Sequence, residues 1–166
     1  RLKGERVMGQ RARGFSLIEL LLVVAIILIL AAIAVPNYMR TRMTANEAAA
    51  VSTLRAIASA EVAYLTTYGT GYSDALAKLG PAPGGGPPSA NFAGLVDELV
   101  AAGSRSGYKF IYNANPPVGS QIVGYKLWAE PAAPGRSGSR YYYVEEDGKI
   151  HFKVGAPAGP GDPALD

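Results

Sequence analysis

Residues 14–38 read GFSLIELLLVVAIILILAAIAVPNY, and this stretch decides the fold. Between Phe15 and Val35, the only polar side chains belong to Ser16 and Glu19. As an α-helix, which rises about 1.5 Å per residue, such a stretch spans roughly 30 Å, the thickness of the hydrocarbon core of a bilayer. The sequence therefore predicts a helix that crosses a membrane.

A short basic segment precedes this helix. Residues 1–14 carry five Lys or Arg against one Glu, a net charge of +4, whereas the other 152 residues carry 11 basic and 12 acidic residues, a net charge of −1. Basic flanks stay on the cytoplasmic side of a membrane, so we expect the rest of the chain to face the periplasm or the exterior. Because the chain begins with Arg1 and not Met, we expect its natural start to lie further upstream.

The composition excludes several kinds of chemistry. Without cysteine, the chain has no disulfide framework, no thiolate metal site and no Cys nucleophile. The single histidine, His151, excludes a two-histidine metal site and any defensible Ser-His-Asp triad. Gly84-Gly85-Gly86 lies among prolines and follows no strand, so it is not a phosphate-binding loop. We expect no enzyme activity, no catalytic residue, no cofactor and no metal.

Hydropathy alone leaves two simpler interpretations of the apolar stretch. It is typical of a cleaved secretory signal, with Ala32-Ile33-Ala34 as the cleavage site, or of a passive anchor for an exported domain. Glu19 argues against both, since a carboxylate inside a transmembrane segment costs on the order of 3 kcal/mol and faces a partner. The natural partner of Glu19 is a cation at the same depth in a neighbouring molecule. The remaining alternative is that Glu19 has no partner and its side chain reaches back to the membrane surface.

The segment Gly14-Phe15-Ser16-Leu17-Ile18-Glu19-Leu20, preceded by Arg11 and Arg13, resembles the class III signal sequence of type IV pilins and of type II secretion pseudopilins. The resemblance continues from Ala32 through Pro36 to Tyr38 and covers about 25 contiguous residues. The later part of the chain resembles this family only in its layout.

The resemblance implies a set of roles for the N-terminal residues. Prepilin peptidase would cleave between Gly14 and Phe15 and N-methylate Phe15. Glu19 would then pair with the Phe15 ammonium of an adjacent subunit during filament assembly. The physical logic agrees, because cleavage creates the missing cation and the pairing converts a costly lone charge into a matched pair. Pro36 predicts a helix kink at the membrane exit, and the resemblance implies that helicity near it can be lost in the filament.

The expected fold class is α+β, the pilin fold, in which a long N-terminal helix packs on a C-terminal antiparallel β-sheet of about four strands. The expected parts are a leader (1–14), the long helix (15–68, with 15–36 transmembrane and later in the filament core), a connecting region with short helices (69–107), the sheet (108–154) and a flexible tail (155–166).

Spacings of three and four residues predict which face of the long helix packs on the sheet. The predicted apolar positions are Val51, Leu54, Ala58, Val62 and Leu65. Glu61 projects from the same side, and we expect it to meet an Arg or a backbone donor.

In the connecting region, Ser73 is expected to cap a short turn that runs through Leu79. Asn91 is expected to cap a helix that Gly103 ends. The apolar positions of that predicted helix are Phe92, Leu95, Val96, Leu99 and Val100.

Strands are predicted at 108–112, 122–129, 140–145 and 149–154, with Asp147-Gly148 as a hairpin turn. Glu145-Glu146-Asp147 permits a calcium site like that of major pseudopilins, although a solvated turn is the simpler interpretation. The tyrosines at 141–143, with Tyr108, Tyr112, Tyr125 and Trp128, permit stacking on sugars or DNA, but packing in the core and between subunits explains them better.

The sequence therefore predicts a structural subunit of a type IV pilus-like filament. The expected partners are other copies in a helical filament, prepilin peptidase, the inner-membrane assembly platform and, before assembly, the membrane itself. The expected location is the inner membrane, with the N-terminus inside, and then an extracellular pilus. A major pseudopilin is the closest alternative, a membrane-anchored binding domain is the next, and a role in DNA uptake is a variant.

Overall fold

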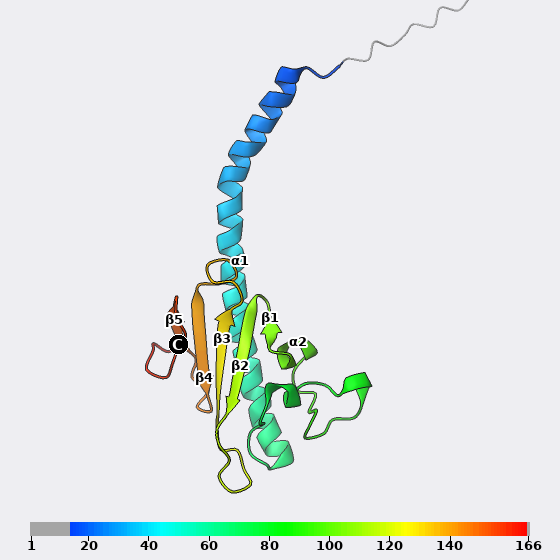
Figure 1. Cartoon of the computed structure of the whole chain (residues 1–166), viewed down its shortest axis with the longest axis vertical. Coiled ribbons are helices and arrows are strands. Elements are labelled where there is room, and N and C mark those ends of the chain that lie inside the picture. Colours follow the sequence, from blue (N-terminus) through cyan, green and yellow to red (C-terminus); the bar gives the residue numbers. More distant parts are fainter. Residues whose placement is uncertain (1–13, 166) are drawn as a thin grey trace, which may run out of the picture. The chain divides into compact units, whose positions relative to one another are not determined.

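The computed structural model describes residues 14–165 and has an α+β fold. Helix α1 (Leu17–Tyr68) is followed by a connecting region and then by a sheet (Figure 1). The connecting region holds the 3-10 helices η1 (Leu76–Leu79) and η2 (Pro83–Gly85) and helix α2 (Glu98–Ala101). The strands are β1 (Ser104–Arg105), β2 (Tyr108–Ala114), β3 (Tyr125–Pro131), β4 (Arg140–Glu145) and β5 (His151–Val154). The chain divides into two compact units after Tyr38, and we call residues 39–165 the head.

In the first unit, α1 starts at Leu17 and continues through Pro36. Leucine and alanine favour the helix, and proline at this position leaves the helical assignment intact. By length and composition, the apolar part of α1 is sufficient to cross a membrane, as the sequence predicts. The kink at Pro36 stays a prediction.

Within the described residues, the sheet has five antiparallel strands in the order β1-β2-β3-β4-β5, one more than the predicted four. The additional strand is β1, which pairs Ser104 with Lys109 in β2. Strand β1 falls within the region predicted as a connection, 69–107. Two residues are too few to show the alternation that predicts a strand. Its turn to β2 is Ser106-Gly107, with φ of 49° and 74°. A two-residue hairpin turn of this kind requires both residues in the left-handed region.

The core of the head lies between α1 and the inner face of the sheet. From α1, the buried side chains are Ala50, Thr53, Leu54, Ile57, Ala60, Glu61 and Tyr64. Leu54 of the predicted face is fully buried and Val51 is partly buried against the core, as predicted. After Leu54 the buried positions lie about one residue before the predicted ones, and Val62 is 54% exposed. The difference arises because Glu61 and Tyr64 have hydrogen-bond partners inside the head, and these bonds offset the cost of removing their polar groups from water.

The predicted helix after Asn91 is much shorter in the structure. Helix α2 is capped by Asp97, whose Oδ1 accepts a bond of 2.9 Å from the Val100 N–H. The chain before it is non-helical, and Leu95 N–H and Val96 N–H both donate to the Leu79 carbonyl. These bonds to η1 outweigh the helical spacing of the apolar residues, although the predicted end at Gly103 agrees with its φ of 77°.

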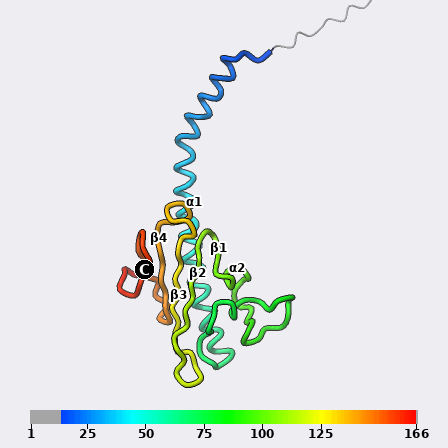
Figure 2. Tube along the Cα trace, in the orientation of Figure 1, coloured from blue at the N-terminus to red at the C-terminus, as the bar shows by residue number. Residues whose placement is uncertain are grey.

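The tail predicted as flexible at 155–166 instead folds back on the sheet over its described part, 155–165. Phe152 N–H donates to the Pro163 carbonyl at 2.9 Å, and Leu165 N–H donates to the Ile150 carbonyl at 2.7 Å. The indole N–H of Trp128 donates to the Ala158 carbonyl at 3.1 Å. Figure 2 shows this segment, in red, looping beside β4 and β5. It covers the outer face of the sheet, where Trp128 packs against Tyr143.

Candidate functional site

The predicted cleavage bond lies just before α1. Gly14 and Phe15 precede the helix, and the Phe15 side chain is 77% exposed. A side chain at Gly14 would meet no atom within 4 Å, so packing does not explain the glycine there. The basic residues of the predicted leader, Arg11 and Arg13 among them, lie outside the described residues.

Glu19 lies in the first turn of α1, where its carboxylate meets the end of the helix. Its Oε2 accepts a hydrogen bond of 3.0 Å from the Ser16 N–H. A Glu three residues after Ser is one half of a capping box, which satisfies backbone donors that the first helical turn leaves open. The positive end of the helix dipole favours the same charge. Ser16 was missed as a functional residue, and the Ser-x-x-Glu spacing was the signal for it.

This geometry determines what Glu19 can offer to a cation. Among residues 14–165 its partner is Ser16 at Oε2, which leaves Oε1 for a further donor. Cleavage after Gly14 would place a new ammonium at Phe15, the residue next to Ser16. The start of α1 therefore holds a carboxylate close to the position where a new positive charge would form, and within residues 14–165 Glu19 takes part in no ion pair.

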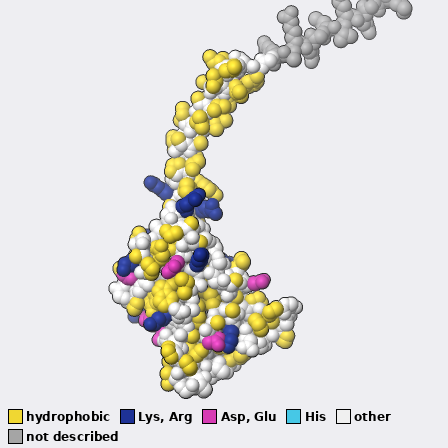
Figure 3. Space-filling model, viewed as in Figure 1, with side chains coloured by type: hydrophobic (Ala, Val, Ile, Leu, Met, Phe, Trp, Pro, Cys, Tyr) yellow, Lys and Arg dark blue, Asp and Glu magenta, His cyan; other side chains and the backbone are white. Residues whose placement is uncertain are grey.

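The remaining surface of this unit is apolar. The large side chains of residues 15–35 are all exposed in the single chain, from 45% for Val24 to 77% for Phe15. An exposed apolar surface of this extent marks a membrane or protein contact. Figure 3 shows hydrophobic side chains, in yellow, along this part of α1.

A second polar cluster is buried in the head, around Glu61. Its Oε2 accepts from the Ser73 N–H at 2.9 Å, and its Oε1 accepts from the Ser73 hydroxyl at 2.5 Å. The Tyr112 hydroxyl donates to the Ser73 carbonyl at 2.8 Å. This confirms a backbone donor for Glu61, whereas the predicted role of Ser73 as a cap was wrong because its side chain turns to Glu61. Burial, and secondarily the Glu61 carboxylate, raise the pKa of Tyr112.

The acidic turn is held by local bonds. Glu145 accepts from the Tyr143 hydroxyl at 2.6 Å, and Asp147 accepts from the Lys149 N–H at 2.9 Å. Within residues 14–165, no three acidic or histidine side chains lie close enough together to hold a metal ion. His151, on β5, bonds through Nδ1 to the Asp162 carbonyl at 2.6 Å. Glu146 and Asp147 are exposed, as the interpretation of a solvated turn expects.

The tyrosines of the sheet pack inside the head. The rings of Tyr112 and Tyr125 stack with centroids 5.5 Å apart, and the buried rings of Tyr108 and Tyr142 form a second pair with centroids 6.0 Å apart. Tyr143 is buried on the other face, against Trp128. Core packing therefore explains these aromatics better than an exposed stacking surface does.

Known proteins are similar to this chain at its N-terminus. The family model described as the prokaryotic N-terminal methylation motif matches residues 9–35. The type IV major pilin protein PilA of Myxococcus xanthus is 42% identical over 73 residues, which cover 44% of this chain and 33% of the relative. The type IV wide pilus major component PilA4 of Thermus thermophilus is 55% identical over 38 residues, which cover 23% of this chain and 29% of the relative. No solved structure gives a significant match.

The matches confirm the resemblance to type IV pilins that the residues around Gly14 and Glu19 carry. They span about a third of the length of each relative. One relative is named as a type IV major pilin and the other as a major component of a type IV wide pilus, and neither is named as a pseudopilin.

Proposed function

We propose that the chain is a non-enzymatic structural subunit of a type IV pilus. In the proposal it is inserted in the inner membrane through α1, cleaved between Gly14 and Phe15, methylated at Phe15 and polymerised. Polymerisation exchanges lipid contacts of the apolar residues for contacts between helices. The heads then form the outside of an extracellular filament. The partners are prepilin peptidase, the assembly platform and further copies of the chain.

One observation carries this proposal. The methylation motif at residues 9–35 coincides with an exposed apolar helix that begins with an acidic side chain. Glu19 has no use in a passive anchor. In a polymer it would pair with the Phe15 ammonium of the adjacent subunit and so fix the axial register between subunits. The capping bond from Ser16 supports this role, because it orients the carboxylate at the end of α1 that would receive the ammonium.

The major pseudopilin of a type II secretion system remains the second candidate, since it uses the same kind of N-terminus. The relatives named as pilus components and the acidic turn without a metal cluster in the described chain both favour the pilus. A membrane-anchored binding domain fits the methylation motif less well. DNA binding has no supporting observation in the head.

Filament formation in cells that carry type IV pilus machinery tests the proposal. The wild-type chain should yield long surface fibres after shearing, visible by electron microscopy and reactive with antibody against the head. Glu19→Gln should reduce the fibres at least about tenfold, because the neutral amide offers the Phe15 ammonium no charge pair. Membrane fractions measure the amount of unassembled chain in each strain.

Glu98→Gln is the matched control, because it removes an exposed carboxylate of the head and leaves the start of α1 unchanged. It should give wild-type fibres. Fibres at the wild-type level with Glu19→Gln would contradict the assembly role of Glu19. A wild-type chain that supports protein secretion but yields no fibres would contradict the pilus and favour the pseudopilus.

A further inference from the structure

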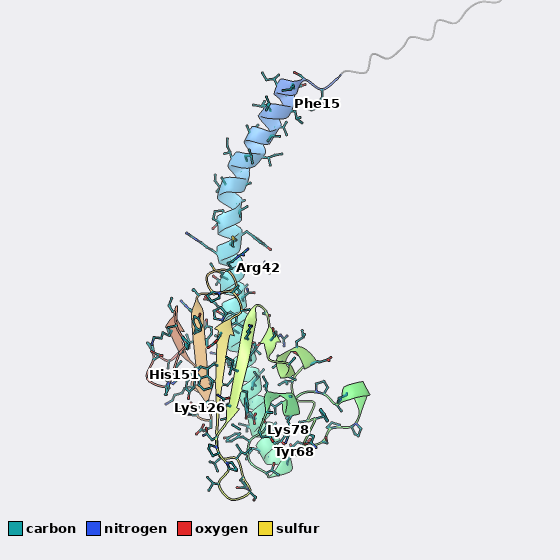
Figure 4. All side chains as sticks on the ribbon, in the orientation of Figure 1. Phe15, Arg42, Tyr68, Lys78, Lys126 and His151 are labelled. Carbon is teal, nitrogen blue, oxygen red and sulfur yellow. The ribbon has the colours of Figure 1, made fainter. Side chains whose placement is uncertain are left out.

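A polar hollow of about 340 Å³ lies in the head where α1, the β1–β2 turn and the β3–β4 loop meet. Figure 4 labels Arg42 on α1 beside that loop. The polar and backbone groups around the hollow come from Arg42, Asn46, Ser106, Gly107, Arg136 and Ser137. None of its lining residues is acidic, so the hollow carries two guanidinium groups and a formal charge of +2.

The two arginines are available to bind an anion. Within residues 14–165, neither Arg42 nor Arg136 takes part in an ion pair. The acidic residue next to the hollow in sequence, Glu47, is already engaged elsewhere. Its carboxylate accepts from the Ser139 N–H at 2.8 Å and lies 3.8 Å from the Arg140 guanidinium. The positive charge of the hollow is therefore not neutralised by the head itself.

The frame of the hollow is fixed by the fold. The side-chain amide of Asn46 donates to the Ser137 carbonyl at 2.8 Å and so fastens the β3–β4 loop to α1. Gly107 has a φ of 74° and forms part of the wall. A Cβ at Gly107 would lie 3.0 Å from the Ser137 Cβ and 3.1 Å from the Asn46 amide nitrogen. Glycine thus keeps open a space that a side chain would crowd.

The hollow follows closely on the apolar span in sequence. Arg42 lies seven residues after Val35 on the same helix. Lipid headgroups border the hydrocarbon core, so basic side chains a few residues beyond an apolar span are placed by sequence to meet their phosphates. Figure 3 shows a group of Lys and Arg side chains, in dark blue, at one end of the head. In the sequence, Arg40 adds a third positive charge two residues before Arg42. Phosphate is the anion of lipid headgroups.

We propose that this hollow binds the phosphate of an anionic phospholipid while the chain is anchored in the membrane. The inference rests on the membrane-anchored stage of the proposed function. Guanidinium groups bind phosphate oxygens through paired, charge-assisted hydrogen bonds, and two arginines in one hollow match one phosphate group. Binding holds the head against the membrane surface before assembly, and the lipid leaves when the subunit enters the filament.

Native mass spectrometry of the full chain in maltoside detergent, free of phosphate, tests this proposal. The first probe is phosphatidylglycerol, and the second is inorganic phosphate at the same concentrations. The wild type should retain one phosphatidylglycerol. Arg42→Gln combined with Arg136→Gln should bind it at least about tenfold more weakly, because the charge-assisted hydrogen bonds are lost. Inorganic phosphate should displace the lipid only in large excess.

The matched control is Arg55→Gln combined with Arg105→Gln, which removes two charges from the same head outside the hollow. It should bind the lipid as the wild type does, and all three chains should melt at the same temperature. Equal lipid binding by Arg42→Gln/Arg136→Gln and the wild type would overturn the proposal. So would an equal loss in the control, or inorganic phosphate that binds as tightly as the lipid. The lipid-binding measurement does not require polymerisation. A chain that forms no fibres would therefore contradict the proposed pilus function without changing the result on lipid binding.

Discussion

At the residue scale, the head contains a fully buried carboxylate, Glu61, with no exposed surface. Burying an unpaired charge costs several kcal/mol, and in the described chain no ion pair offsets that cost for Glu61. The offset comes from Ser73, whose N–H and hydroxyl occupy one carboxylate oxygen each. The pair connects α1 to the start of the connecting region, so it fixes where the chain leaves the helix.

Ser73→Ala should lower the free energy of unfolding of the head by about 1–3 kcal/mol, because one oxygen of a buried carboxylate then lacks its donor. Urea unfolding followed by circular dichroism measures the change. Ser120→Ala, in an exposed loop, is the control and should change the free energy by less than about 0.5 kcal/mol. If the two variants were equally stable, the bond to Glu61 would not be a main support of this junction.

At the element scale, the sheet depends on tyrosines that must stay neutral. Burial raises the pKa of Tyr108, Tyr125 and Tyr142, and nearby carboxylates add to the effect. Tyr143, on the outer face, has a raised pKa from burial and from its bond to Glu145. In the unfolded chain each of these groups ionises near its ordinary pKa of about 10. Because the folded state binds the proton more tightly, raising the pH above that value favours unfolding.

The stability of the head should therefore be constant from neutral pH to about 10 and fall steeply above it. Thermal melting as a function of pH measures the fall, and the ultraviolet absorbance of tyrosinate should rise together with unfolding. Tyr143→Phe should reduce the slope, since one ionisable group is removed while its ring stays packed on Trp128. Tyrosinate absorbance that rises at its ordinary pKa while the head remains folded would contradict this account.

At the scale of the whole molecule, the two units differ in how they bury apolar surface. The head has its own core between α1 and the sheet. In the unit that ends at Tyr38, the large apolar side chains of residues 15–38 are exposed. In a single copy in water this apolar surface would stay exposed. It must therefore be covered by the membrane before assembly and by other copies of the chain afterwards. Removal of the leader, as proposed, would leave a chain with a net charge of −1.

The N-terminal half was predictable because its signals are local. A run of apolar residues determines a membrane helix without reference to the rest of the fold, and the motif around Glu19 is a contiguous string. The strand from Arg140 to Glu145 and the turn at Asp147-Gly148 were predicted for the same reason. The alternation of side chains and a turn dipeptide are visible within a few residues.

The errors fall where distant contacts decide. The short α2 and the bonds of Leu95 to η1 depend on residues far along the chain, and periodicity does not encode them. The ordered course of residues 155–165 depends on two contacts. Trp128, on β3, lies 30 residues before its partner Ala158, and His151, on β5, bonds to Asp162 after the chain has turned back. A Gly- and Pro-rich composition looks flexible when those partners are unknown.

The mass of the N-terminal peptide of the mature chain, isolated from sheared fibres or membranes of cells with type IV pilus machinery, tests the central claim most directly. The account predicts a peptide that begins at Phe15 and carries one methyl group on its amine. Fragmentation locates that methyl group. A chain that retains the Gly14–Phe15 bond, or one that begins at Val35 after a secretory cleavage, would contradict the account.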